Sequence, residues 1–199
     1  MRTFSIIVAL TSEGGIGYNN SIPWKLKGDI KFFKEKTSST LDKTKRNAVV
    51  MGRHTWFSIP EKFRPLPGRL NVIISSTLDS NELPSEHSVV CRDFSSALKL
   101  LSTDPYCIQI ENVFVIGGSL LYKEALAMPQ CTALYITRVY GKFHCDRFFP
   151  RIDFSLFKLP QSYDNSKENS NAPAVLLRSS EDGVNYEIYK LIRVNIKRY

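Results

Sequence analysis

Short runs of valine, isoleucine and other apolar residues recur along the chain, separated by polar or helix-like segments. Such runs are typical of buried β-strands, and they predict strands at 4–10, 47–52, 69–75, 88–91, 112–117 and 132–141. Helical periodicity predicts helices at 26–37, for a few residues from Thr55, at 94–101 and at 118–127. Because the apolar runs show no polar alternation, the pattern favours an α/β fold with a mostly parallel sheet covered on both faces.

Two further apolar segments, 154–163 and 184–194, close the chain with no helical pattern between them. They predict an antiparallel hairpin at the edge of the sheet, with the polar stretch 164–174 as its surface loop. The sequence contains no internal repeat and no long linker. Residues 1–199 are therefore expected to form a single domain with about eight strands and about four helices.

Composition narrows the class of protein. The 199 residues are 43% hydrophobic and 23% charged, as in ordinary globular proteins, and carry a formal charge of +8. A basic balance suits anionic ligands, but no zinc-finger or RNA-binding signature accompanies it, so nucleic acid is not the expected main partner. Four cysteines without a CxxC pair indicate no metal site and a reducing compartment. No signal peptide or membrane span is recognisable, so a cytoplasmic location is expected.

Two predicted strand-to-helix turns carry glycine. The first runs from Gly52 to Thr55, the expected N-cap of the short helix, and the second is Gly117-Gly118 followed by Ser119. Because helix N-termini attract anions, two such turns in one parallel sheet suggest a ligand with two phosphate groups, such as a dinucleotide. The glycines of 14–17 precede a loop, so the usual dinucleotide-binding fingerprint is absent.

Two features upstream of the first helix suggest catalysis. The segment 11–21 lacks periodicity and is expected either to close over a bound ligand or to be a disordered surface loop. Asp29 is a lone acid among apolar residues such as Trp24 and Phe33. It is either a solvated first-turn carboxylate or the proton donor of an enzyme, in which case burial would raise its pKa and the helix N-terminus would offset part of the rise.

Five segments carry a resemblance to a known family: IVAL, GGIGYNNSIPW, VVMGRHTWFSIPEKFRPLPGR, VFVIGGSLLY and CDRFFP. In order and spacing they resemble dihydrofolate reductase of the eukaryotic type, over nearly the whole chain. The resemblance implies NADPH-dependent reduction of 7,8-dihydrofolate to 5,6,7,8-tetrahydrofolate for one-carbon metabolism. Hydride would pass from nicotinamide C4 to pterin C6, with protonation at N5. It also implies inhibition by antifolates such as methotrexate, and a monomer unless the chain is fused to thymidylate synthase.

The resemblance also implies roles for individual residues. Asp29 would be the catalytic acid, with Trp24 and Thr137 holding a water and hydrogen-bonding it. Arg69 would bind the α-carboxylate of the substrate's glutamate tail, a contact suited to a planar guanidinium. The full set of implied substrate contacts is Ile7, Val8, Ile22, Asp29, Ile30, Phe33, Ser58, Ile59, Leu66, Arg69, Ile116 and Tyr122.

The implied cofactor contacts lie in five regions of the chain. They are Ala9, Ile16, Gly17, Asn20, Ser21, Gly52, Arg53, His54, Thr55, Ser75, Ser76, Thr77, Arg92, Gly117, Gly118, Ser119, Leu120, Leu121 and Tyr122. Two of these depart from the family pattern, since His54 and Ser76 stand where many relatives carry lysine or arginine. NADPH is still expected, with a smaller margin over NADH. Cis peptide bonds are implied before Pro65 and between Gly117 and Gly118.

Two other classes of protein compete with this interpretation. One is a fold relative that reduces another heterocycle, such as a pyrimidine reductase of the riboflavin pathway. The pairing of Asp29 with Arg69 argues against it, because the pair matches a pterin at one end and a glutamate tail at the other. The other is a non-catalytic nucleotide- or nucleic-acid-binding module, an interpretation that rests mainly on the net charge of +8.

One residue of the predicted first helix is unexplained by the sequence. Gly28 lowers helix propensity by about 1 kcal/mol relative to alanine.

Overall fold

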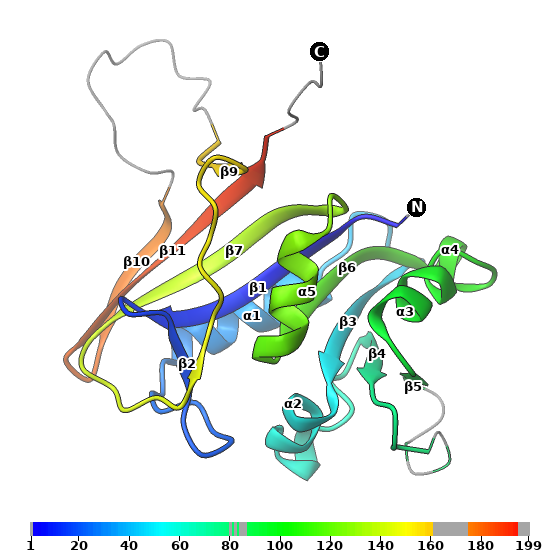
Figure 1. The fold of residues 1–199 in the computed structure, drawn as a ribbon, viewed down its shortest axis with the longest axis horizontal. Helices are drawn as coiled ribbons and strands as arrows, with labels where there is room; N and C mark the ends of the chain where they lie inside the picture. Colours follow the sequence, from blue (N-terminus) through cyan, green and yellow to red (C-terminus); the bar gives the residue numbers. More distant parts are fainter. Residues whose placement is uncertain (1, 80, 82, 84–86, 161–174, 195–199) are drawn as a thin grey trace.

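The computed structural model describes residues 2–79, 81, 83, 87–160 and 175–194 (Figure 1). Their centre is a nine-stranded sheet in the order β10-β11-β7-β1-β6-β3-β4-β5, with β9 also paired to β11. Its strands are β1 (Phe4–Thr11), β3 (Arg46–Gly52), β4 (Arg69–Ile74), β5 (Ser88–Cys91), β6 (Ile110–Gly117), β7 (Cys131–Tyr140), β9 (Phe157–Lys158), β10 (Val175–Glu181) and β11 (Val184–Arg193). Strands β1 and β3 to β7 run parallel, while β9, β10 and β11 pair antiparallel. The predicted fold class is confirmed.

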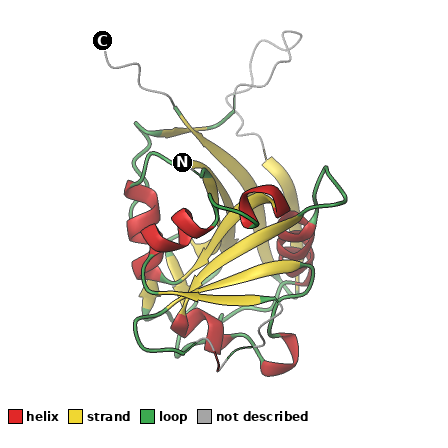
Figure 2. Ribbon diagram, turned by 90° about the vertical axis from the view of Figure 1, so that its right-hand side faces the viewer, coloured by secondary structure: helices red, strands yellow, loops and turns green. Residues whose placement is uncertain are grey.

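Helices cover both faces of the sheet (Figure 2). They are α1 (Lys27–Ser38), α2 (Arg53–Ser58), α3 (Phe94–Leu100), α4 (Tyr106–Gln109) and α5 (Ser119–Ala127), with a 3₁₀ turn at Glu61–Phe63. Side chains of α3 and α5 share a core with Ile6 and Val8, whereas those of α1 and α2 pack with Ile7. Since neighbouring residues of a strand face opposite sides, β1 is buried on both faces, and its run from Ile6 to Leu10 is entirely apolar.

The predicted helices are found, with small differences in their bounds and one addition. The helix predicted at 26–37 is α1, shifted by one position, and α4 is an additional single turn that no periodic pattern predicted. The short helix α2 begins at Arg53 with Gly52 as its N-cap, so the prediction that Thr55 caps it was wrong. Among the described residues, no helix is both long and apolar enough to cross a membrane.

The predicted C-terminal hairpin was wrong in one of its strands. The main partner of β11 is β10, and in the described residues 154–160 the predicted strand is reduced to the two-residue β9, which pairs antiparallel with the end of β11. Strand β10 lies at the sheet edge and its residues are exposed or half-buried, so it lacks the apolar signal of a buried strand. The turn is Asp182-Gly183, both with positive φ, which is a common hairpin signal. The insert 164–174 lies outside the described residues, as does part of the predicted single domain.

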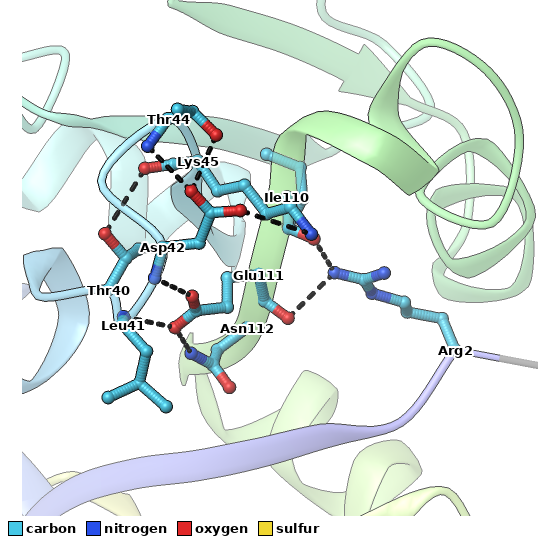
Figure 3. A network of polar contacts seen from close by, with 9 residues as sticks. All are labelled: Arg2, Thr40, Leu41, Asp42, Thr44, Lys45, Ile110, Glu111 and Asn112. Carbon is cyan, nitrogen blue, oxygen red and sulfur yellow. Dashed lines mark hydrogen bonds and ion pairs between the residues drawn. The ribbon is translucent and has the colours of Figure 1, made fainter.

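A polar network ties the connection between α1 and β3 to the start of β6 (Figure 3). The carboxylate of Glu111 accepts the backbone N–H groups of Leu41 at 3.0 Å and Asp42 at 2.8 Å. Asp42 in turn accepts the hydroxyl of Thr44 at 2.6 Å, and Arg2 donates to the Glu111 carbonyl at 3.0 Å. These contacts fix the C-terminal side of α1 above the sheet.

A second, two-stranded sheet orders the segment between β1 and α1. Strand β2 (Gly15–Gly17) pairs antiparallel with β8 (Arg147–Phe148). The turn that follows is closed by two backbone hydrogen bonds between Tyr18 and Ser21, each 2.9 Å. The segment 11–21 is therefore an ordered loop anchored on β8, and the alternative of a disordered loop does not hold.

Candidate active site

The first turn of α1 places Asp29 against β7. Thr137, which is 2% exposed, donates its hydroxyl to Asp29 Oδ1 at 2.6 Å. Thr137 is paired with Ala9 of β1, so the acid, the strand hydroxyl and the end of β1 meet at one place. The hydrogen bond expected from the resemblance is present.

Burial raises the pKa of the Asp29 carboxyl, because removing a carboxylate from water disfavours its charged form. The hydrogen bond from Thr137 opposes this rise, and the negative charge of Glu181 adds to it. Asp29 is thus not the fully solvated first-turn carboxylate of the competing interpretation. It holds a proton to higher pH than an exposed aspartate does.

This raised pKa predicts a pH-dependent stability difference between the parent and Asp29→Asn. Below the unfolded-state pKa of about 4, Asp29 is protonated in both states and its stabilising contribution is complete. As pH rises through the folded pKa, that contribution is lost, because the ionised carboxylate is poorly solvated. The melting temperature of Asp29→Asn minus that of the parent should therefore grow from pH 4 to pH 8. A difference independent of pH would contradict the raised pKa.

Trp24 precedes Asp29 by about one and a half helical turns' worth of residues in the sequence. It is 6% exposed, and its ring centre lies 5.2 Å from that of Phe143. Its indole Nε1–H is buried and has no acceptor among the described residues. Because indole nitrogen only donates, and an unpaired buried donor is costly, a polar group of a bound molecule would be stabilised there. This observation fits a binding site around Asp29.

An apolar cluster continues along α1 from the acid. It joins five of the residues implied in substrate binding from five segments of the chain: Ile7, Phe33, Ile59, Leu66 and Ile116. Val8 differs, since its side chain packs into the core on the opposite face. Any contact of Val8 with a ligand here would therefore use its backbone. Tyr122 donates its hydroxyl to the carbonyl of Ile7 at 3.0 Å, which ties the middle of β1 to α5.

Arg69 lies at the far end of α1 and is 3% exposed. Its guanidinium donates to the Pro67 carbonyl at 3.0 Å and to the Thr37 hydroxyl at 2.7 Å, and it lies 5.9 Å from the Phe33 ring. In the part of the chain that the structure describes, no carboxylate lies within ion-pair distance of it. A buried, oriented cation without an anionic partner is suited to a ligand carboxylate.

The two glycine turns lie against each other because β3 and β6 are neighbours. A Cβ placed on Gly52 would lie 3.8 Å from the Gly118 nitrogen. Gly117 has a φ of +133°, and a Cβ there would lie 3.1 Å from the hydroxyl of Thr55. The backbone is thus bare at both turns, next to the exposed Arg53 at the start of α2. These residues fit a ligand whose phosphates approach the backbone closely. The implied cis bonds, Gly117-Gly118 and Arg64-Pro65, are both present.

Comparison with known proteins bears on this arrangement. Residues 3–180 match the family model described as dihydrofolate reductase. The chain is 40% identical to dihydrofolate reductase of Drosophila melanogaster over 192 residues, which cover 96% of this chain and 98% of that protein. It is 44% identical to dihydrofolate reductase of Aedes albopictus over 160 residues, covering 79% and 86%.

The chain belongs to the dihydrofolate reductase family. Members of this family bind a small-molecule substrate and use a nicotinamide cofactor. A plant relative, the bifunctional dihydrofolate reductase-thymidylate synthase of Zea mays, is 49% identical over 157 residues, which are 79% of this chain and 30% of that protein. The chain therefore spans about a third of the length of such bifunctional relatives.

Several residues implied in cofactor binding already have structural partners. Arg92 donates to the carbonyls of Ser75 at 3.4 Å and Leu78 at 3.0 Å, so it braces the turn after β4. The Ser75 hydroxyl accepts the N–H of Leu78 at 2.9 Å. His54 and Ser76 are exposed, at the ends of the paired strands β3 and β4. Both side chains are open to a charged group that approaches from solvent, as is the exposed Arg53.

Other implied residues lie at the rim of the site or away from it. Ile22 is 63% exposed and Ile30 is 61% exposed, as expected for side chains that a ligand would cover. Leu120 is 84% exposed, whereas its neighbour Leu121 is buried in the core with α3. The anchored turn at Asn20 and Ser21 is exposed, and Ile16 packs partly against the core. Ser58, at the end of α2, is exposed.

Two residues near the acid were not singled out from the sequence. Glu181 of β10 contacts Gly28 from 153 positions away, and Tyr186 of β11 is 1% exposed beside it. The unexplained glycine in the first turn of α1 was the only sequence signal for them. No local pattern connects the three positions.

Proposed function

We propose that this chain reduces 7,8-dihydrofolate to 5,6,7,8-tetrahydrofolate with NADPH as the reductant. The arrangement of α1 carries the proposal. Asp29, Phe33 and Thr37 are spaced four residues apart, so they follow one face of the helix over roughly 12 Å. That face offers an acid, then an aromatic ring, then the hydroxyl that holds the Arg69 guanidinium. A bicyclic heterocycle, a benzoyl ring and a glutamate carboxylate occur in that order in dihydrofolate.

The chain's own residues supply binding, orientation and a proton. Asp29 hydrogen-bonds the pterin ring and, because its proton is retained to higher pH, assists protonation at N5. Thr137 fixes the Asp29 carboxyl by donating its hydroxyl to Asp29 Oδ1. Trp24 offers its indole N–H to a ligand bound near Asp29. The loop 11–21, which contains β2, closes over the ligand and excludes water. The nicotinamide, when bound, supplies the hydride that reduces C6.

The two adjoining glycine turns and the N-terminus of α5 would hold the cofactor phosphates. Ala9, near the end of β1, and Ile16 and Gly17, in β2, would lie beside the nicotinamide. Arg53 and His54 would face the adenosine side, with Ser76 and Thr77 supplying hydroxyl groups.

A parallel assay with two substrates tests this function against its nearest rival. The chain is mixed with NADPH and either dihydrofolate or the aminated ribosyl-pyrimidine reduced in the riboflavin pathway. Consumption of NADPH with dihydrofolate alone, with one tetrahydrofolate formed per NADPH, is the expected result. Turnover of the pyrimidine alone would replace the proposal with that of a pyrimidine reductase.

Cofactor choice should be relaxed relative to family members that carry arginine at the position of Ser76. We expect kcat/KM still to favour NADPH over NADH, but by a margin about tenfold or more smaller than in such relatives, since each lost charge-assisted contact to the 2′-phosphate costs roughly 1.5–3 kcal/mol. Ser76→Arg should widen the margin by lowering the KM for NADPH alone. Equal kcat/KM for NADH and NADPH in the parent would contradict the proposed NADPH preference.

We also propose a cytoplasmic monomer, unless the chain is joined to a thymidylate synthase as in the plant relatives. The four cysteines, which are free thiols, suit a reducing compartment. The exposed Ile30 at the site rim should alter antifolate ranking relative to relatives with an aromatic residue there.

A further inference from the structure

The carboxylate of Glu181 lies on the N-terminus of the helix that carries the proposed acid. Its Oε2 accepts the N–H of Lys27 at 2.6 Å, and its Oε1 accepts the N–H of Gly28 at 2.8 Å. The hydroxyl of Tyr186 also donates to Oε1, at 2.6 Å. Lys27 and Gly28 are the first two residues of α1, whose N-cap residue Leu26 supplies no side-chain cap. A residue of β10 thus does the capping that a local side chain usually does.

This contact explains the glycine before the acid. A Cβ placed on Gly28 would lie 2.1 Å from the Tyr186 hydroxyl and 2.9 Å from Glu181 Oε1. Tyr186 is 1% exposed, so its ring has little room to retreat. Gly28 therefore lets the hairpin of β10 and β11 approach the helix end, at the cost of some helix propensity.

The charge of Glu181 acts on Asp29, the next residue of the same turn. Hydrogen bonds from Tyr186 and Gly28 lower the pKa of Glu181, so it is ionised at neutral pH. Its negative charge raises the pKa of Asp29 beyond the effect of burial. A bare helix N-terminus would do the opposite, since its positive end favours ionised carboxylates.

The groups that face Asp29 come from three elements. Thr137 of β7 donates to it, Glu181 of β10 repels its charged form, and Tyr186 of β11 lies close enough for Asp29 to raise the tyrosine's pKa. On α1 itself, the charge of Lys27 lowers the pKa of Glu181. Glu181 is the negatively charged member of this set besides Asp29.

We propose that Glu181, anchored by Tyr186, is a positioning residue that caps the first turn of α1 and so fixes the place of the Asp29 carboxyl in the site. Its link to catalysis rests on the proposed reduction of dihydrofolate. Its effect on Asp29 does not, because that effect is a property of the folded chain and is measurable without turnover.

The direct test is a carbon-13 NMR titration of the aspartate carboxyl groups, in the parent and in Glu181→Gln. The Asp29 signal is assigned from its loss in Asp29→Asn. Glutamine keeps one acceptor oxygen but removes the charge, so the Asp29 titration should move to lower pH. Glu187→Gln is the matched control, because it removes the same charge from the same hairpin at a residue bonded to Arg178 at 2.8 Å and Tyr140 at 3.0 Å. It should leave Asp29 unmoved.

An unchanged Asp29 titration in Glu181→Gln, or an equal shift in Glu187→Gln, overturns the proposal. In turnover of dihydrofolate, Glu181→Gln should lose about threefold at pH 8 and almost nothing at pH 5, with KM for NADPH unchanged. A shifted NMR titration in a chain that does not turn over dihydrofolate would support the proposal about Glu181 while refuting the proposed function.

A second pair of variants tests the geometry independently of Glu181→Gln and its folding. Gly28→Ala should displace the hairpin from the helix end and move the Asp29 titration to lower pH. Tyr186→Phe removes the hydroxyl that anchors Glu181, so this variant alone should move the Asp29 titration in the same direction. A Gly28→Ala protein with the parent's Asp29 titration would contradict the assigned role.

Discussion

Asp29→Asn is expected to lower turnover of dihydrofolate near neutral pH by about a thousandfold, within the range usual for a lost general acid. Asparagine has nearly the shape of aspartate and can still accept the Thr137 hydroxyl, so the first turn of α1 should keep its place. What is lost is the carboxyl proton, which burial and Glu181 hold to higher pH than usual. The loss should shrink at low pH, where the substrate arrives already protonated.

Single-turnover kinetics from pH 5 to pH 9, with NADPH binding measured separately by fluorescence, would check this prediction. NADPH affinity should remain within about twofold of the parent, because Asp29 is expected to touch only the substrate. Asp93→Asn is the matched control, since Asp93 is an exposed N-cap on α3, where it accepts Ser96 N–H at 2.6 Å. A variant at position 29 with parental turnover at neutral pH would remove Asp29 from the mechanism.

Arg69→Leu is expected to raise the KM for dihydrofolate by about a hundredfold while kcat falls little, since a charge-assisted contact is worth roughly 3 kcal/mol. The guanidinium is buried and already oriented by Thr37 and Pro67, so a ligand carboxylate would meet a fixed pair of donors. The substitution should therefore weaken binding of the glutamate tail and leave the reaction at the pterin ring unchanged.

Dihydropteroate, which lacks the glutamate, separates this role from a purely structural one. Parent and Arg69→Leu should reduce dihydropteroate with similar kcat/KM, whereas a damaged fold would impair both substrates. Arg64→Leu is the control, and it should leave the KM for dihydrofolate unchanged. Arg64 lies in the same connection between α2 and β4, and its guanidinium is 5.5 Å from the centre of the Trp56 ring. An unchanged KM for dihydrofolate in Arg69→Leu would show that Arg69 does not bind the tail.

The buried strands and the long helix were predictable because their signals are local. Strand β3 and helix α1 are specified by apolar runs and periodicity within a dozen residues. The identity of the fold came from the resemblance, which also pointed to Thr137 and the cis bond at Gly117-Gly118. Strand β10 was missed because an edge strand with exposed residues lacks an apolar run.

The rest of the site depends on contacts between distant segments. Nothing near Gly28 in the sequence announces that Glu181 caps the same turn, and Thr55 matched the usual N-cap chemistry although Gly52 holds that position. The opposite orientation of Val8 follows from strand alternation, but only once the faces of β1 are known. These three features follow from the three-dimensional packing of the elements, which the local sequence does not specify.

Mixing the purified chain with NADPH and dihydrofolate, and following the decay of NADPH absorbance with and without methotrexate, asks directly whether the chain reduces dihydrofolate. We expect rapid oxidation of NADPH that requires both reactants and is blocked by the inhibitor. If NADPH and dihydrofolate bind and no oxidation occurs, the chain is not a dihydrofolate reductase by itself, and the proposed role of Asp29 as its acid is contradicted.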